Sequence, residues 1–314
     1  MTLLSLFTPA GVLARAPSLH LAARRLRGMG FEVAIDASAT ARHQRFGGDD
    51  DTRLAALHRV AVAAPSIAMP TRGGYGVTRL LDRIDWKLLA KSVEQGTRWV
   101  GHSDFTAVQL GLLAHIGAGA GAGAGARSSM VTWAGPMATD DFGRADEAGG
   151  VDEVTRDCFL EAMGGELEAV GFRTEAGFDG LDVSGRLWGG NLTMLMSLLG
   201  TPHWPAARLT KGGVLFLEDV NEHPYRVERN LLQLQQAGLL QAQKAVVLGA
   251  FSAWKPSPLD RGYTLKSAVA RVRAGMKTPL LTGLPFGHVQ PKVTLPVGQK
   301  VQLLVNGRDV LVGW

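Results

Sequence analysis

The chain contains 314 residues, of which 46% are apolar and 19% are charged, and its formal net charge is +5. This composition can bury a large core, which excludes disorder over most of the length, and the length favours two domains. The basic residues are scattered along the chain instead of forming one patch, so we expect no nucleic-acid partner.

The N-terminal half alternates short apolar runs with segments of helical periodicity. We predict strands at Leu3–Thr8, Phe31–Ile35, Ser66–Met69 and Arg98–Val100. We predict helices at Leu19–Met29, Asp51–Ala61, Trp86–Ala90 and Phe105–Ile116. Because strands that alternate with helices are typical of a parallel sheet covered on both faces, residues 1–165 are predicted to form an α/β domain.

The middle of the chain is less regular. Residues 117–126 repeat glycine and alanine, which predicts a flexible surface loop. A strand at Met130–Trp133 and a helix over 151–165 are expected to follow. Residues 166–180 show neither periodicity and are predicted to link the two domains.

The last part of the chain, residues 181–314, is predicted to form a more β-rich second domain. Helices are expected at Leu192–Leu199, Tyr225–Ala237 and Leu265–Ala274. Strands are expected at Val214–Leu217, Ala245–Phe251, Val293–Leu295, Lys300–Val305 and Asp309–Val312.

The N-terminus and the single cysteine bear on the compartment. The first basic residue, Arg15, follows the first apolar stretch, whereas a secretory signal has its basic residues before that stretch. No uninterrupted apolar run approaches the roughly 18 residues of a membrane span. Cys158 alone excludes an intrachain disulfide and a cysteine-based zinc site. We therefore expect a soluble, cytoplasmic protein that makes no contact with a membrane.

Ser103 lies at a turn in the segment WVGHSDFT, between a predicted strand and a predicted helix. This arrangement is similar to a nucleophile elbow, although Phe105 stands where the second glycine of that motif is expected. The amides that follow, including that of Asp104, lie at a helix N-terminus and can face a developing oxyanion. A helix cap made by the Ser103 hydroxyl is the alternative interpretation.

A glycine-rich turn, RGGYG at residues 72–76, follows the third predicted strand. Glycine permits positive φ and a close approach of the backbone to a ligand. The spacing lacks the third glycine of a dinucleotide-binding motif, and the lysine of a phosphate-binding loop is absent. The turn therefore predicts no nucleotide cofactor, and either an oxyanion-hole donor or a simple tight turn remains open.

An acid and a histidine occur in the second half of the chain. Glu218 follows the apolar run Val214–Leu217, and ligands collect at the carboxyl ends of strands in open α/β sheets. A buried carboxylate needs a partner, and a histidine N–H can provide one. His288 follows Gly287 in a late loop. The order Ser, Glu, His occurs in α/β-hydrolases, but order alone does not identify a triad.

Taken together, five segments resemble the LD-carboxypeptidase family, which contains serine peptidases of the murein tetrapeptide carboxypeptidase type. These segments are RGGYGVTRLLDRIDW at 72–86, GHSDFTAVQ at 101–109, SGRLWGGNLTML at 184–195, LEDVNEHPYRVERNLLQLQQAGLL at 217–240 and FGHVQPKVTLPVG at 286–298. The glycine-alanine run interrupts the resemblance as an insertion between a helix and a strand.

The resemblance implies a role for each matched residue. Ser103 would be the nucleophile, Glu218 the triad acid and His288 the general base. The amides of Gly74 and Asp104 would form the oxyanion hole. Near the same motifs, we consider Arg72, Tyr75 and Asn191 as candidate substrate-binding residues.

The resemblance also implies a fold and a reaction. The fold would be a flavodoxin-like parallel-sheet N-terminal domain with a smaller, swivelling β/α C-terminal domain, and the chain would form a homodimer. The enzyme would act without metal or other cofactor on a muropeptide, cleaving between an L-centre diamino acid and terminal D-alanine during cell-wall recycling. A related self-immunity hydrolase that cleaves peptidyl-nucleotide antibiotics and a non-catalytic relative that binds small peptides are the alternatives.

Overall fold

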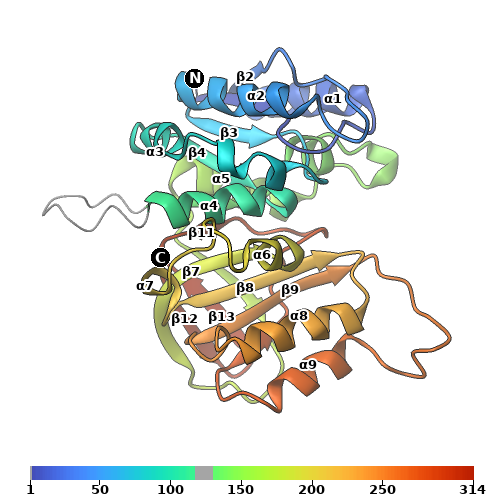
Figure 1. The fold of residues 1–314 in the computed structure, drawn as a ribbon, viewed down its shortest axis with the longest axis vertical. Coiled ribbons are helices and arrows are strands. Elements are labelled where there is room, and N and C mark those ends of the chain that lie inside the picture. Colours follow the sequence, from blue (N-terminus) through green and yellow to red (C-terminus); the bar gives the residue numbers. More distant parts are fainter. Residues whose placement is uncertain (1, 117–129) are drawn as a thin grey trace, which may run out of the picture.

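The computed structural model describes residues 2–116 and 130–314, which form two α/β domains placed one above the other (Figure 1). This confirms the prediction of a two-domain α/β protein. The flexible loop expected at residues 117–126 lies outside the described residues.

The N-terminal domain is built on a six-stranded sheet in the described part of the chain. Its strands are β1 (Thr2–Phe7), β2 (Phe31–Ile35), β3 (Ile67–Pro70), β4 (Arg98–Gly101), β5 (Thr132–Ala134) and β11 (Leu295–Val297). The order is β11-β5-β4-β3-β1-β2, and the first five strands of the chain are parallel. The carboxyl ends of these five strands therefore point to one edge, where ligands are usually bound.

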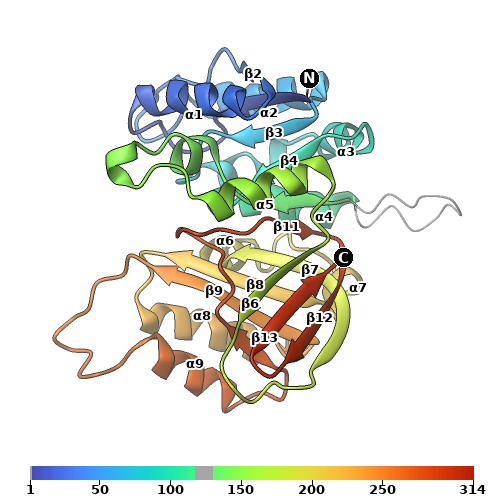
Figure 2. The same ribbon diagram turned by 180° about the vertical axis from the view of Figure 1, so that it is seen from behind.

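Helices cover both faces of this sheet (Figures 1 and 2). They are α1 (Ala16–Gly28), α2 (Asp50–Ala63), α3 (Trp86–Glu94), α4 (Thr106–Ile116) and α5 (Glu153–Gly164). In the figures α2, α3 and α4 lie on one face and α1 and α5 on the other. Two apolar cores follow from this arrangement, because helices on both sides require strands that are apolar on both faces.

The C-terminal domain contains a mixed sheet with seven strands among the described residues. These are β6 (Ala169–Arg173), β7 (Asp182–Asn191), β8 (Val214–Val220), β9 (Ala245–Ser252), β10 (Leu280–Thr282), β12 (Lys300–Asn306) and β13 (Asp309–Gly313). Their order is β10-β9-β8-β7-β12-β13-β6, with β7 to β10 parallel and the others antiparallel. The helices are α6 (Leu192–Leu198), α7 (Ala207–Thr210), α8 (Pro224–Gln236) and α9 (Leu265–Arg273).

Two strands differ from the expected domain division. Strand β6 lies inside residues 166–180, the predicted linker, and pairs with β13 of the second domain. Val170 and Phe172 are buried, whereas Gly171 and Arg173 are exposed. This short alternation is typical of a strand and was missed in the sequence. Strand β11 belongs to the late part of the chain but pairs with β5 of the first domain.

The two domains meet where α4 begins and β7 ends. The backbone amide of Asn191 donates to the Thr106 hydroxyl over 3.1 Å. A Cβ atom at Gly190 would lie only 2.6 Å from the same oxygen, and Gly190 has φ +130°. A glycine is therefore required for this close approach. The contact brings the start of α4, with Ser103 three residues before Thr106, against the strand ends of the second domain.

Candidate active site

Ser103 lies just after β4, at the first residue of the short 3₁₀ segment η3 (Ser103–Phe105) that leads into α4. Its φ is +62°, a left-handed conformation that is uncommon for residues other than glycine. This is the sharp strand-to-helix turn that the sequence predicted. Phe105, in the place of the second glycine, is buried against the rings of Phe7 and Trp99. Such a conformation costs about 1–3 kcal/mol and is retained mainly where function requires it.

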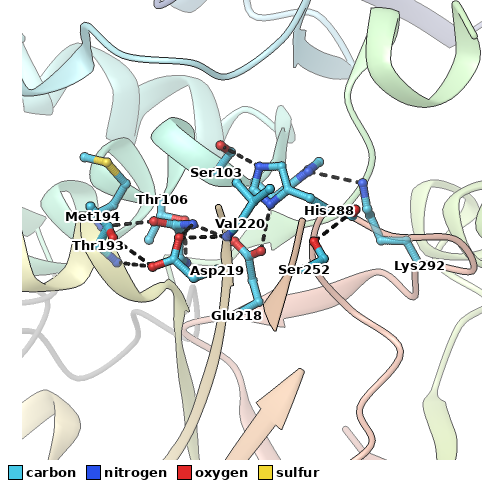
Figure 3. Close-up of polar contacts among 12 residues, drawn as sticks. Ser103, Thr106, Thr193, Met194, Glu218, Asp219, Val220, Ser252, His288 and Lys292 are labelled. Atoms are coloured by element: carbon cyan, nitrogen blue, oxygen red, sulfur yellow. Dashed lines mark hydrogen bonds and ion pairs between the residues drawn. The ribbon is translucent and has the colours of Figure 1, made fainter. Parts of the chain in front are cut away.

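The three residues of the predicted triad lie in one hydrogen-bonded chain (Figure 3). The Nε2 atom of His288 is 2.9 Å from the Ser103 hydroxyl oxygen. The Nδ1 atom of His288 is 2.8 Å from Oε2 of Glu218, which is fully buried. Ser103 belongs to the first domain, whereas Glu218 lies within β8 of the second domain and His288 in the loop after β10. The geometry suits transfer of the serine proton to histidine, while the catalytic roles stay a prediction.

Glu218 is held from behind by a network on β7, β8 and α6. The Asn191 amide nitrogen donates to Oε1 of Glu218 and to Asp219, over 3.0 Å in each case. The Asn191 carbonyl oxygen accepts the amide of Met194 and caps α6. Since both ends of the Asn191 side chain are bonded within the protein, its place is that of a residue that orients Glu218. A substrate contact at Asn191 stays a prediction.

The glycine turn lies against the serine. A Cβ atom at Gly73 would be 2.7 Å from the Ser103 oxygen, so any larger residue there would displace the hydroxyl. The carbonyl of Gly73 accepts the Gly11 amide over 3.1 Å. In a trans peptide the N–H points opposite to the carbonyl, so the Gly74 N–H faces away from Gly11. The assignment of Gly74 to an oxyanion hole remains a prediction.

Asp104 contributes more than the backbone amide considered from the sequence. Its buried carboxylate accepts the amide of Val77 over 2.9 Å, which ties the glycine turn to the residue after the serine. Burial raises the pKa of Asp104 to about 6, against the lowering effect of the Val77 amide. The backbone amide of Asp104 is one of the two predicted oxyanion-hole donors. Its side chain holds the glycine turn, which carries Gly74, the other predicted donor.

A second buried polar cluster lies next to the triad and was not predicted. The Lys292 ammonium is 3.1 Å from Nε2 of His102 and 3.0 Å from the nearer carboxylate oxygen of Asp141. The Nδ1 atom of His102 is 2.8 Å from the carbonyl of Gly135. Because lysine can only donate, His102 accepts at Nε2 and donates at Nδ1. Its ring lies edge-on to that of His288, with centroids 4.9 Å apart.

The electrostatics of the two histidines differ. Burial and the positive charge of Lys292 lower the pKa of His102 well below its ordinary value, so this ring stays neutral. Burial also opposes protonation of His288, but the hydrogen bond and charge of Glu218 outweigh it and raise the pKa of His288. Because the His102 ring is neutral, it adds no positive charge next to His288, the residue that must accept the serine proton.

This difference predicts an acid limb in the pH profile. Only neutral His288 can accept the serine proton, so kcat/KM should rise with pH through a midpoint above 6.5, the ordinary histidine value. The variant Glu218→Gln keeps the burial but removes the negative charge, and its midpoint should lie at a lower pH, with a reduced maximal rate. An unchanged midpoint in this variant would contradict the pairing of Glu218 with His288.

The two remaining candidate substrate-binding residues, Arg72 and Tyr75, belong to the glycine-rich turn. A guanidinium nitrogen of Arg72 donates to the carbonyl of Val12 over 3.2 Å, while its Nε is buried without a partner in the described residues. The Tyr75 side chain is 43% exposed, and its ring packs near Phe46 and the Arg45 guanidinium. The contact of both residues with substrate stays a prediction.

Within residues 2–116 and 130–314, no group of three or more histidine, cysteine or acidic side chains is placed to hold a metal ion. None of the described helices combines the length and apolar character needed to cross a bilayer.

Comparison with known proteins gives consistent matches. Residues 4–123 match the LD-carboxypeptidase N-terminal domain, and residues 184–303 match the LD-carboxypeptidase C-terminal domain. The muramoyltetrapeptide carboxypeptidase of Oxalobacter formigenes has 38% identity and a TM-score of 0.84, over 100% of this chain and 99% of that one. The murein tetrapeptide carboxypeptidase of Pseudomonas aeruginosa is 28% identical, over 96% of this chain and 93% of its own length.

A more distant likeness concerns the fold alone. The microcin C7 self-immunity protein, solved with aspartyl sulfamoyl adenosine, has 19% identity and a TM-score of 0.83 over 100% of this chain and 96% of that chain.

The two family models together cover most of the chain on both sides of the domain boundary, and they contain all three residues of the hydrogen-bonded chain. The chain therefore belongs to the LD-carboxypeptidase family.

Proposed function

We propose that this protein is a serine LD-carboxypeptidase that removes terminal D-alanine from murein tetrapeptides. The observation that carries the proposal is the continuous hydrogen-bonded chain from Ser103 through His288 to buried Glu218. It is supported by membership of the family and by the 38% identity to a muramoyltetrapeptide carboxypeptidase.

The proposed reaction proceeds by acyl transfer. His288 takes the proton from the Ser103 hydroxyl as that oxygen attacks the carbonyl carbon of the diamino acid. Glu218 orients the imidazole and stabilises the imidazolium. The amides of Gly74 and Asp104 stabilise the oxyanion, each by about 3–4 kcal/mol in comparable sites. His288 then protonates the leaving D-alanine amine, and water, activated by the same histidine, releases the shortened peptide.

The finer description of the fold belongs to the same proposal. The N-terminal strand order 2-1-3-4-5 is that of flavodoxin-like sheets, which supports this description of the first domain. Since the triad is divided between the domains, a swivelling movement of the second domain would separate Glu218 and His288 from Ser103. We also propose that the protein acts as a homodimer in the cytoplasm, on fragments released during cell-wall recycling.

One assay tests the reaction directly. The protein is incubated separately with monomeric tetrapeptide, tripeptide and pentapeptide, and the products are identified by mass spectrometry. We expect loss of one alanine from the tetrapeptide and no change in the tripeptide. Intact tetrapeptide after incubation with folded protein would refute the proposed activity.

Two further substrates separate the alternatives. Cleavage of a peptidyl-nucleotide, with the tetrapeptide left intact, would assign the chain to the self-immunity activity. A serine-reactive phosphonate that labels Ser103 would exclude a relative that only binds peptides, because labelling requires an activated hydroxyl.

A further inference from the structure

A basic cavity opens in the N-terminal domain beside the candidate active site. Its volume is about 910 Å³, and it lies between the first half of α1 and the segment that follows η4 (Ala138–Phe142). Its lining carries three arginines, Arg15, Arg24 and Arg144, against one carboxylate, Asp140, among the described residues. We call this the arginine cavity. A volume of this size is that of a small-molecule site, and an excess of one charge in a concave surface concentrates ions of opposite charge.

One residue that lines the arginine cavity, Thr139, is hydrogen-bonded to the segment that leads into the glycine turn. The Thr139 amide and hydroxyl both donate to the carbonyl of Thr71, over 2.8 and 2.9 Å. Thr71 is two residues before Gly73, which lies against the Ser103 hydroxyl. Asp140 interacts electrostatically with Arg72 and His288. The rim of the cavity is therefore attached to the glycine turn.

The histidine loop forms the second connection. The Arg144 guanidinium donates to the side-chain oxygen of Gln290 over 2.8 Å, and Gln290 is two residues after His288. Residues that line the cavity are thus hydrogen-bonded both to the segment before the glycine turn and to the loop that carries His288.

The arginines of α1 and of the residue before it differ in their interactions with the rest of the protein. Arg25 is engaged within the protein, since it pairs with Asp146 over 2.5 Å and donates to the carbonyl of Phe142. Arg15 and Arg24 are exposed, and no hydrogen bond or ion pair joins their side chains to the rest of the described chain. Guanidinium groups bind carboxylates through paired hydrogen bonds. Two such groups in one cavity are free to receive an anionic ligand.

We propose that the arginine cavity binds carboxylate groups of the peptide substrate through Arg15 and Arg24. This rests on the proposed function, because a stem peptide that ends in D-alanine carries several carboxylates. The bound carboxylate can come from two places in the substrate, the terminal D-alanine or the residues before it. In both cases the cavity acts in recognition and takes no part in bond cleavage.

The test compares arginine variants with matched substrates. Arg24→Gln is expected to raise KM for the tetrapeptide about tenfold, and the double variant Arg15→Gln/Arg24→Gln more, with a smaller effect on kcat. Arg271→Gln, on the exposed surface of α9, is the control and should keep the KM of the unchanged protein. A KM that stays within twofold in the double variant would overturn the proposal.

Amidated substrates identify the carboxylate. If the cavity binds the D-alanine carboxylate, the double variant should not distinguish a substrate with a C-terminal amide from the free acid. If the cavity binds the earlier carboxylates, the double variant should not distinguish peptides amidated at those earlier positions from the corresponding free acids. Equal losses of affinity for every substrate would contradict carboxylate recognition.

Binding is measured independently of turnover. Calorimetric titration of the tetrapeptide into Ser103→Ala, with and without the two arginine changes, reports Kd alone. A lower affinity in the triple variant supports the cavity even if another bond proves to be cleaved. Unchanged affinity overturns the cavity and leaves the proposed activity standing.

Discussion

Replacing Ser103 by alanine is expected to lower kcat for release of D-alanine by at least about 10⁴-fold, because a triad without its nucleophile retains only binding and oxyanion stabilisation. The hydroxyl oxygen is the atom that lies 2.9 Å from Nε2 of His288, and alanine removes it without changing the rest of the chain. Single-turnover assays with tetrapeptide, followed by mass spectrometry, measure the loss. Turnover close to that of the unchanged protein would refute the triad.

A second substitution separates the loss of chemistry from the loss of fold. Ser103 has φ +62°, which alanine tolerates no better than serine, whereas glycine adopts it freely. Ser103→Ala should therefore keep the melting temperature. Ser103→Gly should be equally inactive and have a higher free energy of unfolding, by about 1 kcal/mol, after allowance for the flexibility of glycine in the unfolded chain. A large destabilisation in both variants would mean that the hydroxyl is mainly structural.

Replacing Lys292 by methionine is expected to have the largest effect on stability, about 3–5 kcal/mol. Lys292 and Asp141 are each only 2% exposed at the side chain, and their charges are 3.0 Å apart. Methionine fills a similar volume but leaves the Asp141 carboxylate buried without its cation. Urea unfolding should show this loss, and thermal unfolding a decrease in Tm on the order of 10 °C.

The double variant Lys292→Met/Asp141→Asn provides the matched control. Asparagine removes the stranded charge, and its oxygen can still accept the amide of Met137, which Asp141 accepts over 2.8 Å. We therefore expect the double variant to recover part of the lost stability. If it is as unstable as Lys292→Met alone, the cost arises from packing and not from the unpaired charge.

The same pair of variants reports on the histidines. Without the Lys292 ammonium, Nε2 of His102 loses its donor and the ring is free to change its tautomer. The recovered double variant should thus be folded but less active than the unchanged protein. Full activity in it would assign the cluster to stability alone.

Much of the molecule follows from local pattern. Apolar alternation and helical periodicity located the parallel strands from β1 to β4 and the helices α1 to α4 at nearly the observed positions. The serine turn, the glycine turn and the acid near the end of β8 were identified because each combines an unusual residue with the end of a predicted strand. These features depend on neighbours in the chain, so the sequence contains them directly.

Other features depend on contacts between distant residues, which local pattern does not contain. Ser103 and His288 are separated by 185 positions and meet across the domain boundary, where Gly190 lets β7 approach Thr106. The pairing of β6 with β13 and of β11 with β5 is decided by the register of whole sheets. By itself the sequence determined which residues can react. Only the tertiary structure decided that Asn191 is hydrogen-bonded to Glu218, and that Lys292 and Asp141 lie next to His102. The physical reason is that a buried polar group is specified by its partners, and these come from every part of the fold.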